Sequence, residues 1–510
     1  MAELKKNIDK GIAYLKKNGA RAAAVRLCRK VYLSRETNYG KWLQDQRKRR
    51  AKTLPPVNAD HIKIVISGKL PEPIRAEDFF LFIEEGDHLE KDARQVYADA
   101  LLKYPGAELL YCDSDWISGD GRSYQDPQCK PDFDEYYLQS TNYIGGGFLV
   151  SGRLVKELGA PVQLYDYLWR CIERTESVLH VPEILYHRAE KKEDMEMRQE
   201  TDALRKHFDR GGVSAAVLPG LQPWTRKIIY RYGEKPRVSI LIPNKDHRED
   251  LEKCIGSIRK FAGYEPYEIL IIENNSTSEE IFSFYAEIQK KEKNVRVITY
   301  EGDFNFSKIN NFGAKKAKGE YLLFLNNDTE MTTEGCLREM MNYAQRPDVG
   351  AVGAQLLYGD GTIQHAGVIV GYGGVAGHAF EGMPRQQALE ITPIICSRSY
   401  SAVTAACMLV RRSLFEKLGG FDERLGVAYN DIDLCLRIGA SGEKVIYTPY
   451  AQLFHYESRT RGLELTQEKA KRVKRETEVF QKRWSALLEK GDPCYNPNLT
   501  LEKPDFSLRR

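Results

Sequence analysis

The sequence lacks several features that would assign it to particular classes of protein. Its ten cysteines are scattered, with no CxxC pair and no zinc-binding spacing, so neither a disulfide scaffold nor a zinc module is indicated. No apolar run is long enough to cross a bilayer, and the N-terminus has no apolar signal core. The net charge of +4 is too small to indicate a nucleic-acid-binding protein. These absences predict a cytoplasmic protein with free thiols.

The first 57 residues carry a strong local excess of positive charge. Their basic residues include the run Arg47-Lys48-Arg49-Arg50, and Leu54-Pro55-Pro56 near the end of the segment marks a linker. Apolar residues recur at helical spacing, which predicts an amphipathic helical arm over residues 1–57. The arm either lies on anionic lipid headgroups at the inner face of the cell membrane or packs, with a solvated basic face, on the next domain.

The 453 residues after this arm alternate short apolar segments with helical patterns. In residues 58–232 the expected strands are 62–66, 79–83 and 109–111. In residues 233–465 they are 238–242, 269–272, 295–299, 321–325 and 349–354, with a helix over 251–261. Residues 466–510 are expected to form a charged helix (467–487) and a turn-rich tail on the domain surface. Such alternation predicts an α/β protein with doubly wound, mostly parallel sheets.

An internal repeat relates the two α/β regions. Residues 77–87 parallel residues 319–328, and each segment is followed by a helical pattern and a second apolar strand. The two regions therefore read as copies of one domain. The first copy is shorter, because only one expected strand precedes residues 79–83.

The segment 319–330 organises the second copy. Its apolar run 321–325 ends abruptly in Asn326, Asn327 and Asp328. Ligands of open α/β sheets bind outside the carboxyl ends of strands, and one carboxylate among neutral amides suits a hard divalent cation. Alternatively, Asp328 only caps the following helix.

Two further loops are expected at the same edge of the sheet. The first strand is followed by Pro243, Asn244, Lys245 and Asp246, and the second by Glu273, Asn274, Asn275 and Ser276. Any one loop is weak evidence, because Asn and Ser are ordinary turn residues. Three such loops on one edge predict a site for the base and ribose of a nucleotide.

Three residues downstream are candidates for chemistry. Asp431 and Asp433 open an amphipathic helix, where carboxylates serve either as helix caps or, in the functional interpretation, as a general base. His455 follows the last expected strand and is either a metal ligand or a hydrogen-bonded core histidine.

Eight motifs follow one another in order: Ser239–Pro243, Ile272–Ser276, Phe324–Thr329, Ile363–Gly367, Ala405–Met408, Gly419–Glu423, Tyr429–Asp433 and His455–Ser458. This series, which covers about half the chain, resembles family 2 inverting glycosyltransferases. The similarity is to the branch of bacterial rhamnosyltransferases of cell-surface polysaccharides.

The resemblance implies a GT-A fold, a nucleotide-diphosphate sugar donor and a Mg²⁺ or Mn²⁺ ion. It places Asp328 and His455 at the metal, with Asn326 replacing the first acid of the family's Asp-x-Asp, and Asp431 at the catalytic base. Glu273 stands where the family has an aspartate for the nucleotide base. Further implied donor contacts are Pro243, Asn244, Lys245, Asp246, Asn275, Lys308, Asn326 and Asn327, and implied acceptor-side residues are Ala405, Cys407, Asp422 and Asp433.

The first copy resembles the same family but lacks residues that the family's reaction requires. Gly86 stands opposite Asp328, so that the metal carboxylate is missing or displaced to Asp87, and Leu164 occupies the base position. The nucleotide loops before the metal strand are largely absent. This degenerate copy is expected to be inert, packing on the active one or helping to hold the acceptor glycan.

The resulting hypothesis is transfer of a sugar, from dTDP-rhamnose or a UDP-sugar, to a glycan or lipid-linked acceptor with inversion. Here the metal takes the place of the carboxylic acid that glycosidases need. One alternative is a non-catalytic glycan-binding partner of a polysaccharide synthesis complex. Another is a nucleotidyltransferase, but that activity normally requires a Gly-rich phosphate loop, which residues 243–247 do not provide.

Overall fold

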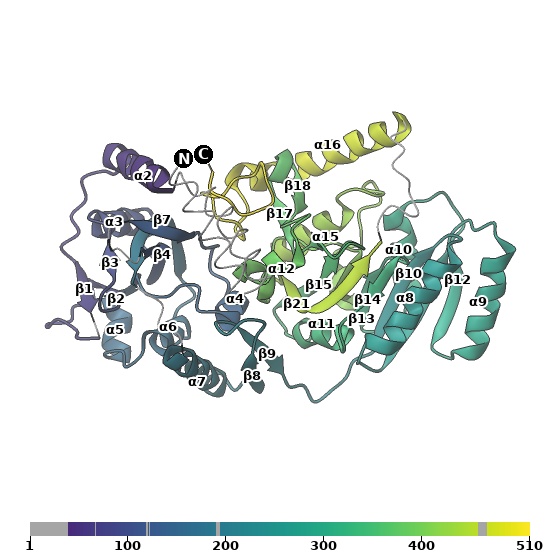
Figure 1. Ribbon diagram of the computed structural model, residues 1–510, viewed down its shortest axis with the longest axis horizontal. Helices are drawn as coiled ribbons and strands as arrows, with labels where there is room; N and C mark the ends of the chain where they lie inside the picture. The colour runs from purple at the N-terminus through teal and green to yellow at the C-terminus, as the bar shows by residue number, and fades with distance from the viewer. Residues whose placement is uncertain are drawn as a thin grey trace, which may run out of the picture.

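The computed structural model describes residues 39–66, 68–118, 121, 123–189, 194–456 and 467–509, which form two α/β sheets side by side (Figure 1). The part of the expected arm before Tyr39 lies outside these ranges, as does the segment 457–466 that contains Ser458. Within the described ranges, no helix has both the length and the apolar character needed to cross a membrane.

The first sheet has the strand order β1-β2-β6-β4-β7-β3, with β5 paired to β4. Its strands are β1 (Ile62–Ile66), β2 (Phe79–Ile83), β3 (His88–Leu89), β4 (Leu109–Ile117), β5 (Tyr124–Gln128), β6 (Phe148–Ser151) and β7 (Val178–Arg188). The helices of this half are α3 (Ala93–Lys103), α4 (Glu135–Ser140), α5 (Gly152–Leu158), α6 (Leu164–Ile172) and α7 (Asp194–Arg210). The expected strands 62–66 and 79–83 are confirmed to the residue, and β4 continues beyond the expected 109–111.

The second sheet has the order β12-β11-β10-β13-β20-β15-β21-β14, with β16 on β15 and β19 on β21. Its strands are β10 (Val238–Asn244), β11 (Tyr267–Glu273), β12 (Val295–Thr299), β13 (Tyr321–Leu325), β14 (Thr329–Met331), β15 (Val349–Leu357), β16 (Ile363–His365), β19 (Arg398–Ser399), β20 (Cys407–Arg411) and β21 (Lys444–His455). A small hairpin pairs β17 (Val368–Val370) with β18 (Ala376–His378). All five strands expected between residues 233 and 465 are therefore confirmed.

Helices pack around this second sheet (Figure 1). They include α8 (Arg248–Phe261), α9 (Glu279–Lys291), α10 (Phe306–Lys316), α11 (Cys336–Ala344), α14 (Arg412–Lys417) and α15 (Asn430–Ala440). The charged helix expected at 467–487 is α16 (Gln467–Lys490). Every residue of β13 is buried, because the strand lies inside the sheet between β10 and β20.

The two sheets share a topology. The six strands β1-β2-β6-β4-β7-β3 and β10-β13-β20-β15-β21-β14 follow each other in the same order, and β6 and β20 are each antiparallel to both neighbours. The second sheet continues beyond β10 into β11 and β12, for which the first sheet has no equivalent among the described residues. The two sheets thus match over six strands and differ at β11 and β12, a pattern that the proposed internal repeat would produce.

The two halves are joined by a continuous apolar core. One cluster of buried residues extends from Phe82 in the first sheet to Leu323 in the second, passing through tyrosines at the seam. The Tyr136 hydroxyl donates to Asp348 at 2.8 Å, and the amide group of Asn342 bonds the backbone of strand β9 (Arg226–Tyr230). Strand β9 pairs with β8 (Ala215–Pro219) in a hairpin that lies between the two halves (Figure 1).

Helix α2 (Tyr39–Thr53) is the described part of the basic arm, and it packs on the first sheet's domain. Arg50 is 4% exposed and pairs with Asp92 at 3.0 Å and Glu183 at 3.1 Å. Arg49 also pairs with Glu183. For this segment the packing alternative holds, because much of the basic face is engaged by acids of the neighbouring domain.

A second contact of α2 involves a buried carboxylate. Glu90 accepts hydrogen bonds from Arg47 and lies 2.9 Å from Nε2 of His187. Burial opposes ionisation of Glu90, but the hydrogen bonds from His187 and Arg47 lower its pKa to about 2. The carboxylate is therefore ionised at neutral pH and anchors the helix.

The tail after α16 is more deeply inserted than the sequence predicts. Instead of lying on the surface, Asn496 is 2% exposed and donates from Nδ2 to both carboxylate oxygens of Asp113, at 3.0 and 2.8 Å. Asp492, also buried, accepts from the backbone N–H of Val370. The tail thus bonds to both halves of the protein, and this explains its burial.

Candidate active site

The site begins where β13 ends. The chain turns at Asn326, whose backbone N–H donates to the carbonyl of Ala406 at 3.1 Å. Asn327 and Asp328 are 8% and 6% exposed, so both side chains face into the protein at the edge where ligands are expected.

A chain of hydrogen bonds connects the ends of three neighbouring strands. Asn327 donates to Asn244 Oδ1 at 2.7 Å, Asn244 donates to the hydroxyl of Tyr285 at 2.7 Å, and Tyr285 donates to Glu273 at 2.7 Å. Burial raises the pKa of Tyr285, so its hydroxyl remains a donor. The structure therefore brings together Asn244, Glu273 and Asn327, which the sequence placed in one site.

The predicted nucleotide residues mostly hold the loops in shape. Glu273 also accepts from the backbone N–H of Ser276 at 2.6 Å, and Asn275 donates to the carbonyl of Gly302 at 2.8 Å. Asp246 accepts the N–H groups of Thr277 and Ser278; burial opposes ionisation, but these bonds lower its pKa. Pro243 is half-buried and Lys245 exposed beside them, and Lys308 is exposed in the first turn of α10.

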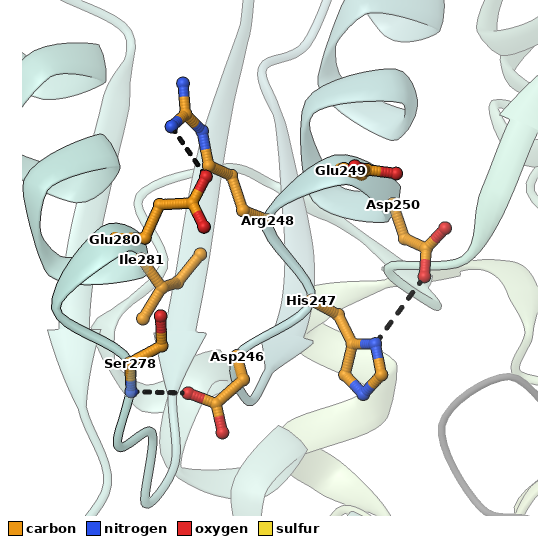
Figure 2. Close-up of a pocket in the computed structure, with 8 residues that line it drawn as sticks. All are labelled: Asp246, His247, Arg248, Glu249, Asp250, Ser278, Glu280 and Ile281. Atoms are coloured by element: carbon orange, nitrogen blue, oxygen red, sulfur yellow. Dashed lines mark hydrogen bonds and ion pairs between the residues drawn. The ribbon is translucent and has the colours of Figure 1, made fainter.

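A hollow of about 380 Å³ lies between the starts of α8 and α9, next to these loops (Figure 2). Asp246 and Ser278 line it on one side, and the ion pair between Arg248 and Glu280, 2.9 Å long, crosses it. His247 points away from that pair, toward Asp250.

The candidate metal ligands lie together. Asp328 Oδ1 is 3.3 Å from His455 Nε2, and the same nitrogen is 3.1 Å from the amide of Asn326. Thr329 and His455 face each other across β14 and β21, and this pairing places Asp328 beside the histidine. The described residues contain no group of three or more His, Cys, Asp or Glu suited to a metal. The protein thus offers one carboxylate and one imidazole, a donor set that fits a cation whose remaining ligands are water and phosphate oxygens.

Gln364 fixes the histidine in the form that can bind a metal. Nδ1 of His455 lies 2.7 Å from Oε1 of buried Gln364, an oxygen that can only accept, so Nδ1 carries the proton. The lone pair of the neutral ring is then on Nε2, the atom facing Asp328. The sequence analysis missed Gln364 as a site residue, although it lies in the motif Ile363–Gly367.

Two more histidines lie behind Gln364. His365 Nδ1 is 2.8 Å from His378 Nδ1, and burial, with the neighbouring His378 and His455, holds the pKa of His365 well below its usual value. His365 is therefore neutral, and the site's surroundings carry no extra positive charge from it.

Asp431 is tied to the same part of the site. Its Oδ2 accepts the backbone N–H of Ala405 at 3.0 Å, while the next residue, Ala406, bonds Asn326. Tyr429, with a left-handed φ of 62°, precedes α15 and sets the direction in which the helix starts. Asp431 is partly exposed, so its carboxylate can reach a ligand.

Asp433 does not face an acceptor, contrary to the expectation from the resemblance. Its carboxylate is fully buried and accepts from Arg437 at 2.9 Å, Arg483 at 2.7 Å and Trp484 at 3.1 Å. Successive residues of an α-helix are rotated by about 100° around the helix axis, so the carboxylates of Asp431 and Asp433, two positions apart, point to different sides. The Asp433 side chain therefore anchors α16 through Arg483 and Trp484.

Of the other residues expected on the acceptor side, Cys407 is also buried, whereas Asp422 and Ala405 are held by contacts that leave their expected role a prediction. Cys407 is 1% exposed, with Sγ 3.8 Å from the sulfur of Met340, so its thiol lies in the core. Asp422 is bound by Arg424 and Arg483, and the Arg424 hydrogen bond is the main reason that its pKa is lowered. Ala405 contributes its backbone N–H rather than its side chain.

The first sheet's counterpart of this site keeps an aspartate and a histidine at matching positions, Asp87 and His187, but holds them by different contacts. Pairing of His88 with His187 matches that of Thr329 with His455, so strand register places Asp87, rather than Gly86, opposite Asp328. The carboxylate of Asp87 is bound by the hydroxyl of Tyr186 and the N–H of Ala189.

At the position of the candidate base, the helix starts match Asp431 with Tyr165, one residue from the Leu164 expected from sequence. Burial raises the pKa of Tyr165 to about 12. Neither Leu164 nor the neutral hydroxyl of Tyr165 can take a proton from an attacking hydroxyl at neutral pH.

Comparison with known proteins agrees with this geometry. Residues 239–419 match the model of glycosyl transferase family 2. The chain is 36% identical over 451 residues to the O-antigen biosynthesis protein RfbC of Myxococcus xanthus, covering 85% of this chain and 34% of that protein. Over 78 residues it is 37% identical to an N-acetylglucosaminyl-diphospho-decaprenol L-rhamnosyltransferase of Mycobacterium tuberculosis, covering 15% of this chain and 24% of that protein. The expected resemblance to family 2 glycosyltransferases and to rhamnosyltransferases is thus confirmed.

Among solved structures, GalNAc-T7 with UDP, GalNAc and Mn²⁺ aligns with a TM-score of 0.41 and 18% identity over 51% of each chain. The chain spans between about a third and a half of the length of the curated relatives that it matches over most of its own residues.

Proposed function

We propose that this chain, whose residues 239–419 form a family 2 glycosyltransferase domain, moves a sugar from a nucleotide-diphosphate donor to a hydroxyl of a growing cell-surface glycan, with inversion. The observation that carries the proposal is the Ala405–Ala406 dipeptide. Its N–H holds Asp431, and its carbonyl holds the loop of Asp328. A base and a metal-binding acid on either side of one backbone segment suit a transfer between two bound substrates.

Asp328 and His455 would hold a Mg²⁺ or Mn²⁺ ion. Such an ion, when bound, neutralises charge on a departing diphosphate. Gln364, as the acceptor for the Nδ1 proton, would orient His455 with Nε2 toward the metal, and the bond from Asn327 to Asn244 links the metal loop to the nucleotide loops.

Asp431 would act as the general base. Its partly exposed carboxylate would take the proton of the acceptor hydroxyl while that oxygen attacks the anomeric carbon. A single displacement of this kind inverts the configuration, and it requires no second carboxylic acid.

We further propose four regions: a basic helical arm (1–57), a degenerate and inactive GT-A copy (58–232), the catalytic domain (233–465) and a C-terminal helix with its tail (466–510). The matching strand orders and the replacement of Asp431 by Leu164 or Tyr165 support this division. The degenerate copy would pack against the catalytic domain or help to hold the acceptor.

The donor is proposed to be dTDP-rhamnose or a UDP-sugar, and the acceptor a glycan or a lipid-linked glycan. A cytoplasmic enzyme with such an acceptor would work at the inner face of the membrane. Because Arg49 and Arg50 pair with acids, membrane contact through the arm would depend on its remaining basic residues, including exposed Lys41, Lys48 and Lys52.

Thermal unfolding in the presence of UDP, dTDP or GDP, with and without Mn²⁺, tests the function. A ligand that binds only the native state stabilises it by RT ln(1 + [L]/Kd), so one nucleotide with Mn²⁺ should raise Tm. The corresponding nucleotide sugar should then be consumed by the wild type but not by Asp431→Asn. If no nucleotide changes Tm, the protein is better described as a glycan-binding partner.

A further inference from the structure

Helix α16 contacts the loop that leads to Asp431. The carboxylate of Glu476, 1% exposed, accepts the backbone N–H groups of Gly426 at 3.2 Å and Ala428 at 2.7 Å. Among the described residues, Arg472 also lies near it, with Nε 3.8 Å away. Two N–H groups of this loop thus bind the buried carboxylate, and hydrogen bonds to a carboxylate are stronger than those to a neutral oxygen.

Further contacts hold the same helix to the same loop. Arg483 bridges Asp422 at 2.8 Å and Asp433 at 2.7 Å. Phe480 is fully buried, and its ring centroid lies 5.3 Å from that of Tyr429. These contacts place α16 along the loop from Asp422 to the start of α15.

The opposite side of the loop is held by the beginning of α10. Asn305 donates to the carbonyl of Glu423 at 3.0 Å, Ser307 donates to that of Leu425 at 2.5 Å, and the N–H of Phe306 donates to that of Gly426 at 2.8 Å. The carbonyls of the loop thus bond α10, whereas two of its N–H groups bond Glu476.

This double attachment explains how Tyr429 can adopt its backbone conformation. A non-glycine residue with φ of 62° is strained and persists only where its surroundings determine it strongly. The hydrogen bond from the Ala428 N–H to Glu476 restrains the residue before Tyr429, and the ring of Phe480 lies against the ring of Tyr429 itself. Asp431 follows two residues later, so any relaxation of Tyr429 would move it.

We propose that Glu476 is a positioning residue that holds the 422–429 loop so that Asp431 meets the acceptor in the reactive geometry. The proposal rests on the proposed role of Asp431 as the base. A displacement of about 1 Å at a reacting group can lower a rate about 100-fold. Loss of the Glu476 carboxylate should therefore lower kcat while leaving nucleotide affinity unchanged.

The test compares Glu476→Ala and Glu476→Gln with Glu478→Ala, a change at an exposed glutamate of the same helix. Turnover is measured with the nucleotide sugar that the wild type consumes fastest, and binding with UDP or dTDP plus Mn²⁺. We expect Glu476→Ala to lower kcat about 10- to 100-fold, Glu476→Gln to lower it less, and Glu478→Ala to leave it unchanged. Hydrogen exchange at Gly426 and Ala428 should become faster in the first two variants only.

A double-mutant cycle with Asp431→Asn distinguishes positioning from general stabilisation. If Glu476 acts through Asp431, Glu476→Ala should cause no further loss of kcat in the Asp431→Asn background. A multiplicative loss in that background, or an unchanged kcat despite faster exchange, would overturn the proposal. If Glu476→Ala does not fold, the same cycle is run with Glu476→Gln. Asp431→Asn with full activity would instead refute the proposed function, while exchange at Ala428 would still report on the loop.

Discussion

Asn substitutions at Asp431 and Asp433 should have opposite effects, although the two residues are neighbours on one helix. Asp431→Asn keeps the shape and one acceptor oxygen for the Ala405 N–H, so the free energy of unfolding should change by less than about 1 kcal/mol. Loss of a general base typically lowers the rate by about 10²- to 10⁴-fold. Nucleotide affinity should be retained, because the base does not hold the donor.

Asp433→Asn should lower stability instead. Removing one partner of a buried ion pair costs about 3–5 kcal/mol, and Asp433 is fully buried between Arg437 and Arg483. Since these arginines are 19% and 32% exposed, water can compensate part of the loss, and we expect about 2–3 kcal/mol. Any decrease in kcat should arise through the loop that Arg483 holds.

The assay pairs urea unfolding with turnover, measured for both variants at a temperature where each is folded. We expect Asp431→Asn to have a wild-type urea midpoint and very slow turnover, and Asp433→Asn to have a lowered midpoint and most of its turnover. The reverse pattern, with Asp433→Asn stable but inactive and Asp431→Asn active, would refute the assignment of the base and of the helix contact.

Three other changes test separate parts of the structure. Asp328→Ala should abolish the dependence of UDP or dTDP binding on Mn²⁺ in calorimetry, whereas equal affinity in the variant, the wild type and EDTA would contradict a metal site. Gln364→Met, which removes the acceptor for the His455 N–H, should weaken Mn²⁺ binding about 10- to 100-fold without unfolding the protein. Glu90→Gln should lower stability by about 3 kcal/mol at neutral pH, since the pKa of Glu90 falls from 4.5 to about 2 on folding. This contribution is present above pH 4.5 and is lost as the pH falls toward 2, so urea unfolding of wild type and variant should converge there; a constant difference would contradict the pairing with α2.

Much of the fold could be predicted from the sequence, because buried strands leave a simple signal. Segments such as 321–325 are short, wholly apolar and bounded by polar residues, and the structure places their strands at those residues. The match of Gly86 with Asp328 went wrong by one residue, because the loop between β2 and β3 is one residue longer than that between β13 and β14. Only cross-strand pairing reveals such an insertion.

The site was predictable in position but not in detail. The carboxyl ends of parallel strands meet at one edge, so Asn244, Glu273 and Asn327 could be grouped from sequence alone. Which way each side chain turns depends on partners far along the chain. Asp433 faces Arg483 fifty residues later, and Gln364 reaches His455 across 91 residues. No local pattern records those pairs.

The contact between Asn496 and Asp113 has a consequence for biosynthesis. The two residues are 383 positions apart, so the ribosome completes the first sheet long before it makes the asparagine. During that interval the buried carboxylate of Asp113 lacks the amide that later binds it, and keeps its contacts with His180 and the N–H of Lys130, both in the first half. Domains generally fold as they emerge, N-terminal ones first. Here the first domain would fold with Asp113 held by His180 and Lys130, and the bonds from Asn496 would be added last.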